Sequence, residues 1–329
     1  MIRTLLLALL LCLIFSFITG LITIPLLRKF KVGQTVLKYV TVHQNKNGTP
    51  TMGGLFFILP SIIIFFVLFG FENRIATVCV VIGLAYLIVG FIDDFIKIKS
   101  NKNEGLKPYQ KIIFQLAIAV LSGIFCYKNS ITYLYLPFVK KTIDVGVFII
   151  PFSAFIFLAI TNSVNLTDGL DGLASSVSVV YLFFIASLIY VETKTFSKLY
   201  VLDSEYQSLM GLGFSLIGGN LAFLLFNQPK ARVFMGDTGS LSLGGFLGVI
   251  SIFSSNSLFI PLLGVVFVLS SVSVIIQVVY FKLTNGKRVF LMSPFHHHLQ
   301  LKGFSESQIS YYYSIVTCIM GVLLIIFYL

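Results

Sequence analysis

The sequence predicts an all-α integral membrane protein that crosses the bilayer about ten times, and its composition and hydropathy support this prediction. Of its 329 residues, 57% are hydrophobic and 11% are charged, whereas soluble globular proteins average about 45–50% and about 25%. The mean hydropathy is +0.98. These values exclude a soluble enzyme, a disordered chain and a coiled coil. Because apolar runs continue along the whole chain, we expect residues 1–329 to form a single membrane domain.

Ten apolar runs approach the length of about 20 residues that a bilayer-spanning helix needs. The first follows Arg3 and is longer than the core of a signal peptide, so we interpret it as a membrane helix. The ten expected spans are residues 3–24, 51–70, 75–92, 110–127, 145–162, 173–191, 207–226, 238–256, 259–281 and 308–328.

The connections between these spans differ in charge. Four of them hold 16 of the 23 Lys and Arg residues, and the rest of the chain holds 7. These four connections are residues 25–50, 93–111, 227–240 and 282–305. Since cytoplasmic loops are enriched in Lys and Arg, we expect these four in the cytoplasm and both termini outside. This asymmetry accounts for the net charge of +11, so we expect no nucleic-acid partner.

Carboxylates gather at span ends on the expected cytoplasmic side. Asp93 and Asp94 end the third span, where the helix dipole disfavours anions, so a cation or a catalytic role is favoured. Neighbouring helix residues project about 100° apart, so these two carboxylates should face different partners. Asp237 opens the eighth span and offers Mg²⁺ a hard oxygen ligand. Phe234 lies just before it and is suited to stacking on a base.

Two further segments carry polar groups on this side. If residues 165–171 are helical, Asn165, Asp168 and Asp171 share one face of the helix, although aspartates there also suit a helix cap. Residues 296–298 are three consecutive histidines after Pro294. A regular helix cannot aim all three at one metal ion, so we expect a loop that offers hydrogen-bond donors to phosphates or one proton-transferring group.

This inventory indicates phosphoryl transfer. Carboxylates with Mg²⁺, lysines, histidines and glycine-containing segments at a membrane surface provide the positioning and charge neutralisation that this chemistry needs. A water-soluble donor would enter from the cytoplasm, and a lipid phosphate acceptor would enter sideways between spans. The residues alone identify neither substrate.

Five segments, in order, resemble the signatures of the phospho-N-acetylmuramoyl-pentapeptide transferase family, within the polyprenyl-phosphate N-acetylhexosamine-1-phosphate transferase superfamily. They are Thr49–Gly54, Asp93-Asp94, Asn165–Ala174, Phe234–Ser240 and Pro294–His298. The resemblance implies ten membrane helices, a cytoplasmic active site in the bacterial inner membrane and a homodimer. It also implies Mg²⁺-dependent transfer of phospho-MurNAc-pentapeptide from UDP-MurNAc-pentapeptide to undecaprenyl phosphate. The products would be lipid I and UMP, in the first membrane step of peptidoglycan synthesis.

The resemblance also implies roles for individual residues. The magnesium and catalytic carboxylates are Asp93, Asp94 and Asp237, and His296 is a further catalytic group. The substrate-binding residues are Lys46, Asp171 and Phe234 for uridine, Lys111 for phosphate, and Asn165, Asp168, Asn227, Gln277, His297 and His298 for the sugar-phosphate and peptide. Two questions stay open: which carboxylate of the Asp93-Asp94 pair acts as the base, and whether transfer is a single displacement or passes through a phospho-aspartate.

The nearest alternative is an enzyme that loads N-acetylglucosamine-1-phosphate onto the same lipid. It would share the aspartates and magnesium, but the segments Thr49–Gly54 and Pro294–His298 resemble the muramoyl branch. One departure from the family is Glu104, where relatives often carry a basic or neutral residue, so we expect no phosphate contact there. A transporter is disfavoured because the ionisable groups gather at one interface and not at the midplane.

Overall fold

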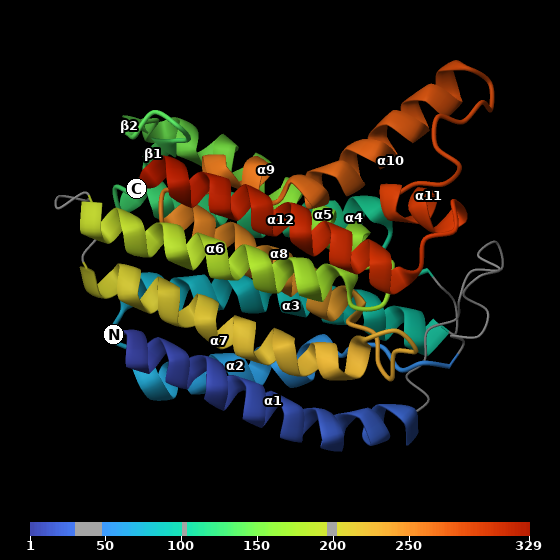
Figure 1. Cartoon of the computed structure of the whole chain (residues 1–329), viewed down its shortest axis with the longest axis horizontal. Coiled ribbons are helices and arrows are strands. Elements are labelled where there is room, and N and C mark those ends of the chain that lie inside the picture. Colours follow the sequence, from blue (N-terminus) through green and yellow to red (C-terminus); the bar gives the residue numbers. More distant parts are fainter. Residues whose placement is uncertain (30–47, 101–103, 196–202) are drawn as a thin grey trace.

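The structure is a computed structural model that describes residues 1–29, 48–100, 104–195 and 203–329. Long helices lie side by side in one bundle (Figure 1). They are α1 (Ile2–Lys29), α3 (Arg74–Ser100), α4 (Pro108–Lys128), α5 (Ile149–Thr167), α6 (Leu173–Thr195), α7 (Asp203–Asn227), α8 (Gly236–Phe253), α10 (Val265–Leu283) and α12 (Glu306–Tyr328). The shorter elements are α2 (Gly54–Phe69), α9 (Ile260–Leu263), α11 (Phe295–Leu301), the 3₁₀ helices η2 (Gly146–Phe148) and η3 (Ser257–Phe259), and the strands β1 (Tyr133–Leu136) and β2 (Lys141–Asp144).

Nine helices in the described part of the chain are long and apolar enough to cross a membrane, which confirms the prediction of a polytopic α-helical membrane protein. A helix stands at each of the ten expected positions, but α2 has only 16 residues. Three helices continue at least five residues past their expected ends: α1 to Lys29, α3 to Ser100 and α5 to Thr167. The ninth expected span is interrupted at Gly264, between α9 and α10.

A two-stranded antiparallel sheet between α4 and α5 was not predicted. It pairs Tyr133 with Asp144 and Leu136 with Lys141. Each strand has four residues, which is too short for alternation of apolar and polar residues to identify it.

Helix α8 lies in the middle of the bundle, with all its residues from Thr238 to Phe253 buried. Small residues allow the neighbouring helix α3 to approach it closely. A Cβ atom on Gly90 of α3 would collide with the main chain of Asp237, and one on Gly83 would collide with the Phe246 ring. This close approach brings the end of α3 beside the start of α8.

The two ends of the bundle differ. The chain termini lie together at one end, and α3 ends and α11 lies toward the other (Figure 1). A shared end for both termini agrees with an even number of crossings. Helix α10 leans away from the bundle toward the end that holds α11 (Figure 1).

Candidate active site

Three aspartates from two helices form a carboxylate cluster at the end of the bundle opposite the termini. In Asp93, Asp94 and Asp237, one carboxylate oxygen from each residue lies within 4.8 Å of the others. Asp93 and Asp94 are 2% and 3% exposed. Hard carboxylate oxygens gathered in this way are the ligands that Mg²⁺ prefers, so the donor chemistry fits the metal that the sequence predicts.

The two neighbouring aspartates of α3 face different partners, as their helical spacing predicts. Asp94 accepts hydrogen bonds from the start of α8: from Asp237 N at 3.2 Å, Thr238 N at 2.9 Å and Thr238 Oγ1 at 2.7 Å. Asp93 Oδ1 instead accepts from Leu106 N at 2.8 Å. Asp94 therefore caps α8 and fixes Asp237, whereas Asp93 Oδ2 lies 2.6 Å from Lys97 Nζ.

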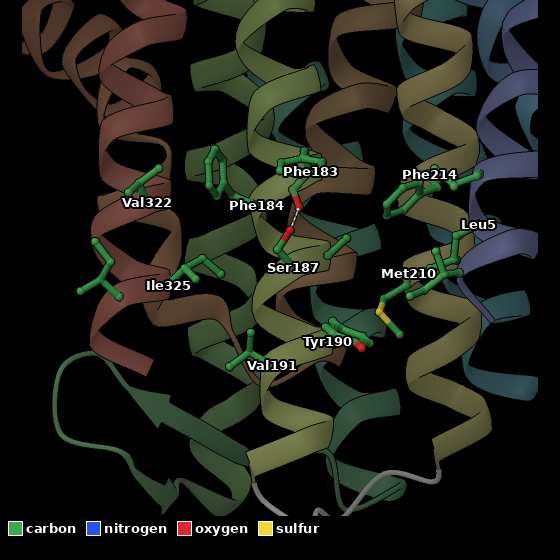
Figure 2. A pocket seen from close by; sticks show the side chains of 14 residues that line it. Leu5, Phe183, Phe184, Ser187, Tyr190, Val191, Met210, Phe214, Val322 and Ile325 are labelled. Atoms are coloured by element: carbon green, nitrogen blue, oxygen red, sulfur yellow. Dashed lines mark hydrogen bonds between the residues drawn. The ribbon is translucent and has the colours of Figure 1, made fainter. Parts of the chain in front are cut away.

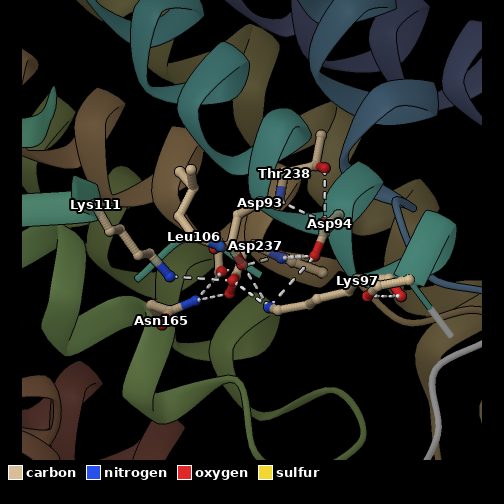
Figure 3. Close-up of polar contacts among 11 residues, drawn as sticks. Asp93, Asp94, Lys97, Leu106, Lys111, Asn165, Asp237 and Thr238 are labelled. Carbon is tan, nitrogen blue, oxygen red and sulfur yellow. Dashed lines mark hydrogen bonds and ion pairs between the residues drawn. The ribbon is translucent and has the colours of Figure 1, made fainter. Parts of the chain in front are cut away.

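Two lysines compensate the charge of the cluster (Figure 3). Lys97 Nζ lies 2.6 Å from Asp93 Oδ2, 3.8 Å from Asp94 Oδ1 and 2.6 Å from Asp237 Oδ2. Lys111 Nζ, from the start of α4, lies 3.0 Å from Asp237 Oδ2. Sequence reasoning singled out Lys111 but missed Lys97, although Lys97 follows Asp93 by four residues and so lies on the same face of a helix.

Asn165, near the end of α5, completes the surroundings of Asp237. Its Nδ2 donates to Asp237 Oδ1 and, at 2.8 Å, to Ser240 Oγ. Ser240 Oγ in turn donates to Gly236 O at 2.9 Å. Figure 3 shows Lys111 and Asn165 approaching Asp237 from one side and Lys97 approaching it from another. The structure thus brings two ammonium groups and one amide, from the three helices α3, α4 and α5, to the carboxylate of Asp237.

The segment after α5 differs from the expected helix. Helix α5 ends at Thr167, so Asn165, Asp168 and Asp171 do not share one helix face. Burial raises the pKa of Asp168 well above its usual value, and the negative charges of Asp237, Asp94 and Asp171 raise it further. Asp168 therefore lies within electrostatic range of the carboxylate cluster.

Asp171 and Asn227 hold two loops together. Asp171 Oδ2 accepts from Ala231 N at 3.1 Å, and Asp171 N donates to Glu306 Oε2 of α12 at 2.9 Å. The buried Asn227 accepts from Gly172 N at 2.9 Å and donates to Val233 O at 2.8 Å. These contacts tie residues 168–172 to residues 228–235, just before Asp237.

Phe234 sits between these loops and the start of α2. Its main-chain N donates to Pro50 O at 2.7 Å, and its main-chain O accepts from Gly53 N at 2.9 Å. These bonds fix the backbone that presents the half-buried ring. Lys46, the other residue expected to hold uridine beside Asp171, lies outside the described residues.

The three histidines lie on α11, which begins directly after Pro294, so the prediction of a loop there was wrong. His296 is 0% exposed. A Cβ atom on Gly169 would meet His296 Nε2 at 2.5 Å and His297 Nε2 at 3.1 Å, so both rings pack on the loop that carries Asp168. A glycine at 169 allows this close approach.

His298 points to a different neighbourhood. Its Nδ1 accepts from Leu291 N at 3.1 Å, and its ring packs on Phe290 and Phe295. Burial and then the charge of Lys302 lower the pKa of His298 from 6.5, so the neutral ring is favoured. The first two histidines thus contact the loop at Asp168, and the third holds the segment before α11.

Gln277, from α10, also holds this segment. Its Oε1 accepts from Val289 N at 3.2 Å and Phe290 N at 2.9 Å. A pocket of about 550 Å³ opens beside it, lined by Gln277, Val278, Phe281, Lys282, Arg288, Met292 and Ser293. It lies next to the histidine helix and carries two cationic side chains.

A second pocket, of about 390 Å³, lies between α1, α6, α7 and α12 (Figure 2). Its walls are almost wholly apolar, and the Ser187 hydroxyl is used within α6, where it donates to Phe183 O at 2.8 Å. Since it lacks carboxylates, lysines and histidines among its lining residues, it offers no phosphoryl-transfer chemistry.

Comparisons with known proteins identify the family of the chain. The family model for "Glycosyl transferase family 4" matches residues 76–255, and the model for "Phospho-N-acetylmuramoyl-pentapeptide-transferase signature 1" matches residues 46–58. A relative from Clostridium novyi (strain NT) is 42% identical over 321 residues, which cover 94% of each chain. One from Thermoanaerobacter sp. (strain X514) is 40% identical over 320 residues, which cover 97% of each chain. Both are named phospho-N-acetylmuramoyl-pentapeptide-transferase, and at this identity and coverage the chain belongs to that family.

Proposed function

We propose that the chain transfers phospho-MurNAc-pentapeptide from UDP-MurNAc-pentapeptide to undecaprenyl phosphate, forming lipid I and UMP. The observation that carries this proposal is the cluster of three carboxylates with two lysine ammonium groups at one end of a membrane bundle. Such a site suits a reaction in which two phosphates meet at the membrane surface, because their charge must be neutralised there. The names of the relatives support a phospho-MurNAc-pentapeptide donor, and undecaprenyl phosphate is the acceptor that the resemblance to the family implies.

Asp93, Asp94 and Asp237 would hold the Mg²⁺ of this reaction. When bound, the metal supplies charge neutralisation and orientation to the phosphoryl oxygens. Asp94 has a second duty, since its hydrogen bonds to Asp237 N and to Thr238 hold the start of α8 in place.

The transfer itself is a displacement at phosphorus. An oxygen of undecaprenyl phosphate attacks the phosphorus that carries the sugar, and the bond from that phosphorus to UMP breaks. Asp93 is the member of the pair suited to accept a proton from the lipid phosphate or to orient it, because the oxygens of Asp94 accept hydrogen bonds from the start of α8, whereas Asp93 Oδ2 forms an ion pair with Lys97. Lys97 and Lys111 would turn from the carboxylates to the incoming phosphate oxygens.

The remaining residues would bind the donor. Lys46, Asp171 and Phe234 would hold the uridine part, with the Phe234 ring stacking on the base. Asp168 and the histidines would line the sugar-phosphate and peptide side. The packing of His296 and His297 on Gly169 supports this arrangement, because it brings these rings next to the loop that carries Asp168. Asn227 and Gln277 would act there through the loops that they hold.

The proposed setting is the bacterial inner membrane, with the carboxylate cluster at its cytoplasmic face. The chain has the many apolar helices that a multi-pass membrane enzyme needs, and the 16-to-7 charge asymmetry supports the orientation. We also expect a homodimer, as in the family that the sequence resembles.

The test is UMP release by purified protein in detergent with undecaprenyl phosphate. UDP-MurNAc-pentapeptide and UDP-N-acetylglucosamine are compared, each with Mg²⁺ or with EDTA. Magnesium-dependent release from the muramoyl donor alone is the expected result. Release from the acetylglucosamine donor instead would keep the chemistry and change the sugar, and release from neither donor would overturn the proposal.

A further inference from the structure

Hydrogen bonds among Tyr86, Gln115 and Asn162 join the helices α3, α4 and α5 about one helical turn from the site residues of α4 and α5, and we call this group the polar junction. Asn162 Nδ2 on α5 donates to Gln115 Oε1 on α4 at 2.7 Å. Tyr86 OH on α3 donates to the main-chain oxygen of Gln115 at 3.2 Å. Gln115 and Tyr86 are both 0% exposed. These three helices supply Asp93, Lys111 and Asn165 to the site, so the junction ties its supports together.

The junction lies one helical turn from two residues of the site. Gln115 follows Lys111 by four residues on α4, and Asn162 precedes Asn165 by three residues on α5, so each pair shares one helix face. Helix α4 leads away from the site and α5 leads back to it. Lys111 and Asn165 both contact Asp237. The position of α4 relative to α5, which the Gln115–Asn162 hydrogen bond sets one helical turn away, therefore decides whether both side chains reach it.

If Gln115 served only to fill space between the helices, it would destabilise the fold relative to an apolar residue. Its Nε2 group is buried and has no partner among the described residues, and such an unmet amide is costly in an apolar surrounding. A leucine of similar size would fill the same space without that cost. Asn162 Nδ2 also donates to Leu158 O at 2.8 Å, so it stays satisfied without Gln115. The Gln115–Asn162 hydrogen bond therefore fixes the position of α4 relative to α5, while the buried Nε2 group of Gln115 lowers the stability of the fold.

We propose that Gln115 and Asn162 are positioning residues that fix α4 against α5, so that Lys111 and Asn165 both reach Asp237. Helices in lipid gain no hydrophobic stabilisation from contact with each other, so a side-chain hydrogen bond between them specifies their register. The inference rests on the proposed function for its effect on turnover. Misplacement of a reacting group by about 1 Å can lower a rate by roughly 100-fold.

The first test is steady-state turnover and thermal unfolding of Gln115→Leu. We expect kcat to fall roughly tenfold or more, the KM for the UDP-linked donor to change by less than about twofold, and the unfolding midpoint to stay level or rise. A role in packing alone predicts the reverse: a lower midpoint with kcat preserved. That result would overturn the proposal.

A matched control removes a buried interhelical hydrogen bond far from the site. Tyr181 of α6 and Ser251 of α8 share a hydrogen bond of 2.8 Å between buried hydroxyls, and Tyr181→Phe deletes it with little change of shape. We expect kcat of Tyr181→Phe to stay within about twofold of the wild type. An equal loss of kcat in Tyr181→Phe and Gln115→Leu would show a general effect of bundle loosening and refute the specific role.

A double-mutant cycle tests whether the two residues act together. If they act through their shared bond, Asn162→Leu lowers kcat as Gln115→Leu does, and the double variant falls little further. Multiplicative losses would mean independent roles and contradict the proposal.

A distance measurement tests the inference without any turnover. Spin labels at Ile113→Cys on α4 and Ala159→Cys on α5 occupy exposed positions, in a background where the exposed Cys318 is replaced by Ser. We expect Gln115→Leu to broaden or shift the distance distribution. An unchanged distribution defeats the positioning role, whereas a changed distribution in a protein that releases no UMP defeats only the proposed function.

Discussion

Lys97 and a metal ion would compete for the same carboxylate oxygens, and this competition can be measured. Lys97 Nζ lies 2.6 Å from both Asp93 Oδ2 and Asp237 Oδ2, within the group of oxygens suited to Mg²⁺. Replacement of Lys97 by methionine keeps much of the side-chain stem and removes the charge. In the absence of metal, the cluster then keeps Lys111 as its remaining ammonium partner among the described residues.

The size of the effect follows from burial. Removing one partner from a buried ion pair costs about 3–5 kcal/mol. The Lys97 side chain is 24% exposed, so water screens part of its charge and the low end, about 3 kcal/mol, applies. At about 2 °C for each kcal/mol in a chain of this size, the unfolding midpoint in EDTA should fall by about 6 °C.

The assay is thermal unfolding of wild type and Lys97→Met in detergent, each in EDTA and across a MgCl₂ titration, without substrate. We expect Mg²⁺ to restore most of the lost unfolding midpoint in Lys97→Met. The Mg²⁺ concentration that gives half of this rise should be lower for the variant than for the wild type, because the competing ammonium group is gone. Lys97→Arg, which retains the charge, is the control. A midpoint drop in Lys97→Met that Mg²⁺ leaves untouched would refute the competition and make Lys97 a packing residue.

Three further predictions concern other parts of the site. Asp237→Asn should remove most UMP release while the protein stays folded in detergent; near-normal turnover with unchanged magnesium dependence would contradict the metal assignment. Phe234→Ala should weaken binding of the UDP-linked donor more than binding of undecaprenyl phosphate, measured by titration of each, and equal losses would indicate packing. Burial and Lys302 lower the pKa of His298 from 6.5, so unfolding takes up a proton and stability should fall as the pH drops below about 6.5. The midpoint of His298→Gln, which keeps an acceptor for the Leu291 N–H, should fall less over that range.

The bundle and the aspartates could be predicted because their evidence is local in the sequence. Each membrane helix is a continuous apolar run, and Asp93, Asp94 and Asp237 stand at run ends where unpaired charge is unexpected. The interruption at Gly264 could not be predicted in this way, because α9 and α10 are both apolar and hydropathy does not change across the break. The histidine helix α11 was missed because its seven residues are too few for a periodic pattern to identify it.

The role of Lys97 in the site was not predicted, because the positive-inside rule already explains a lysine at that position. Lys97 lies in the connection 93–111, and a lysine in a cytoplasmic connection is what the positive-inside rule leads one to expect, so its charge indicates orientation without any role in chemistry. The extension of α3 to Ser100 places Lys97 inside the helix, where the four-residue spacing aims it at Asp93. Its contact with Asp237 depends on α8, which lies 140 residues further along the chain.

Asp171 and Asn227 show why residue roles are harder to predict than residue positions. A side chain that binds a ligand and one that holds the loop around a ligand are chosen from the same polar residues. Asp171 Oδ2 meets Ala231 N, and Asn227 bridges Gly172 and Val233, so both side chains use protein partners in the structure. The roles of Asp93 and Asp94 also depend on a distant helix. Helix α3 alone makes the two side chains point in different directions. The close approach of α8 at Gly90 lets Asp94 cap α8, whereas Asp93 Oδ2 pairs with Lys97. Roles within the site are therefore set by contacts between helices distant in sequence, which a single sequence does not record.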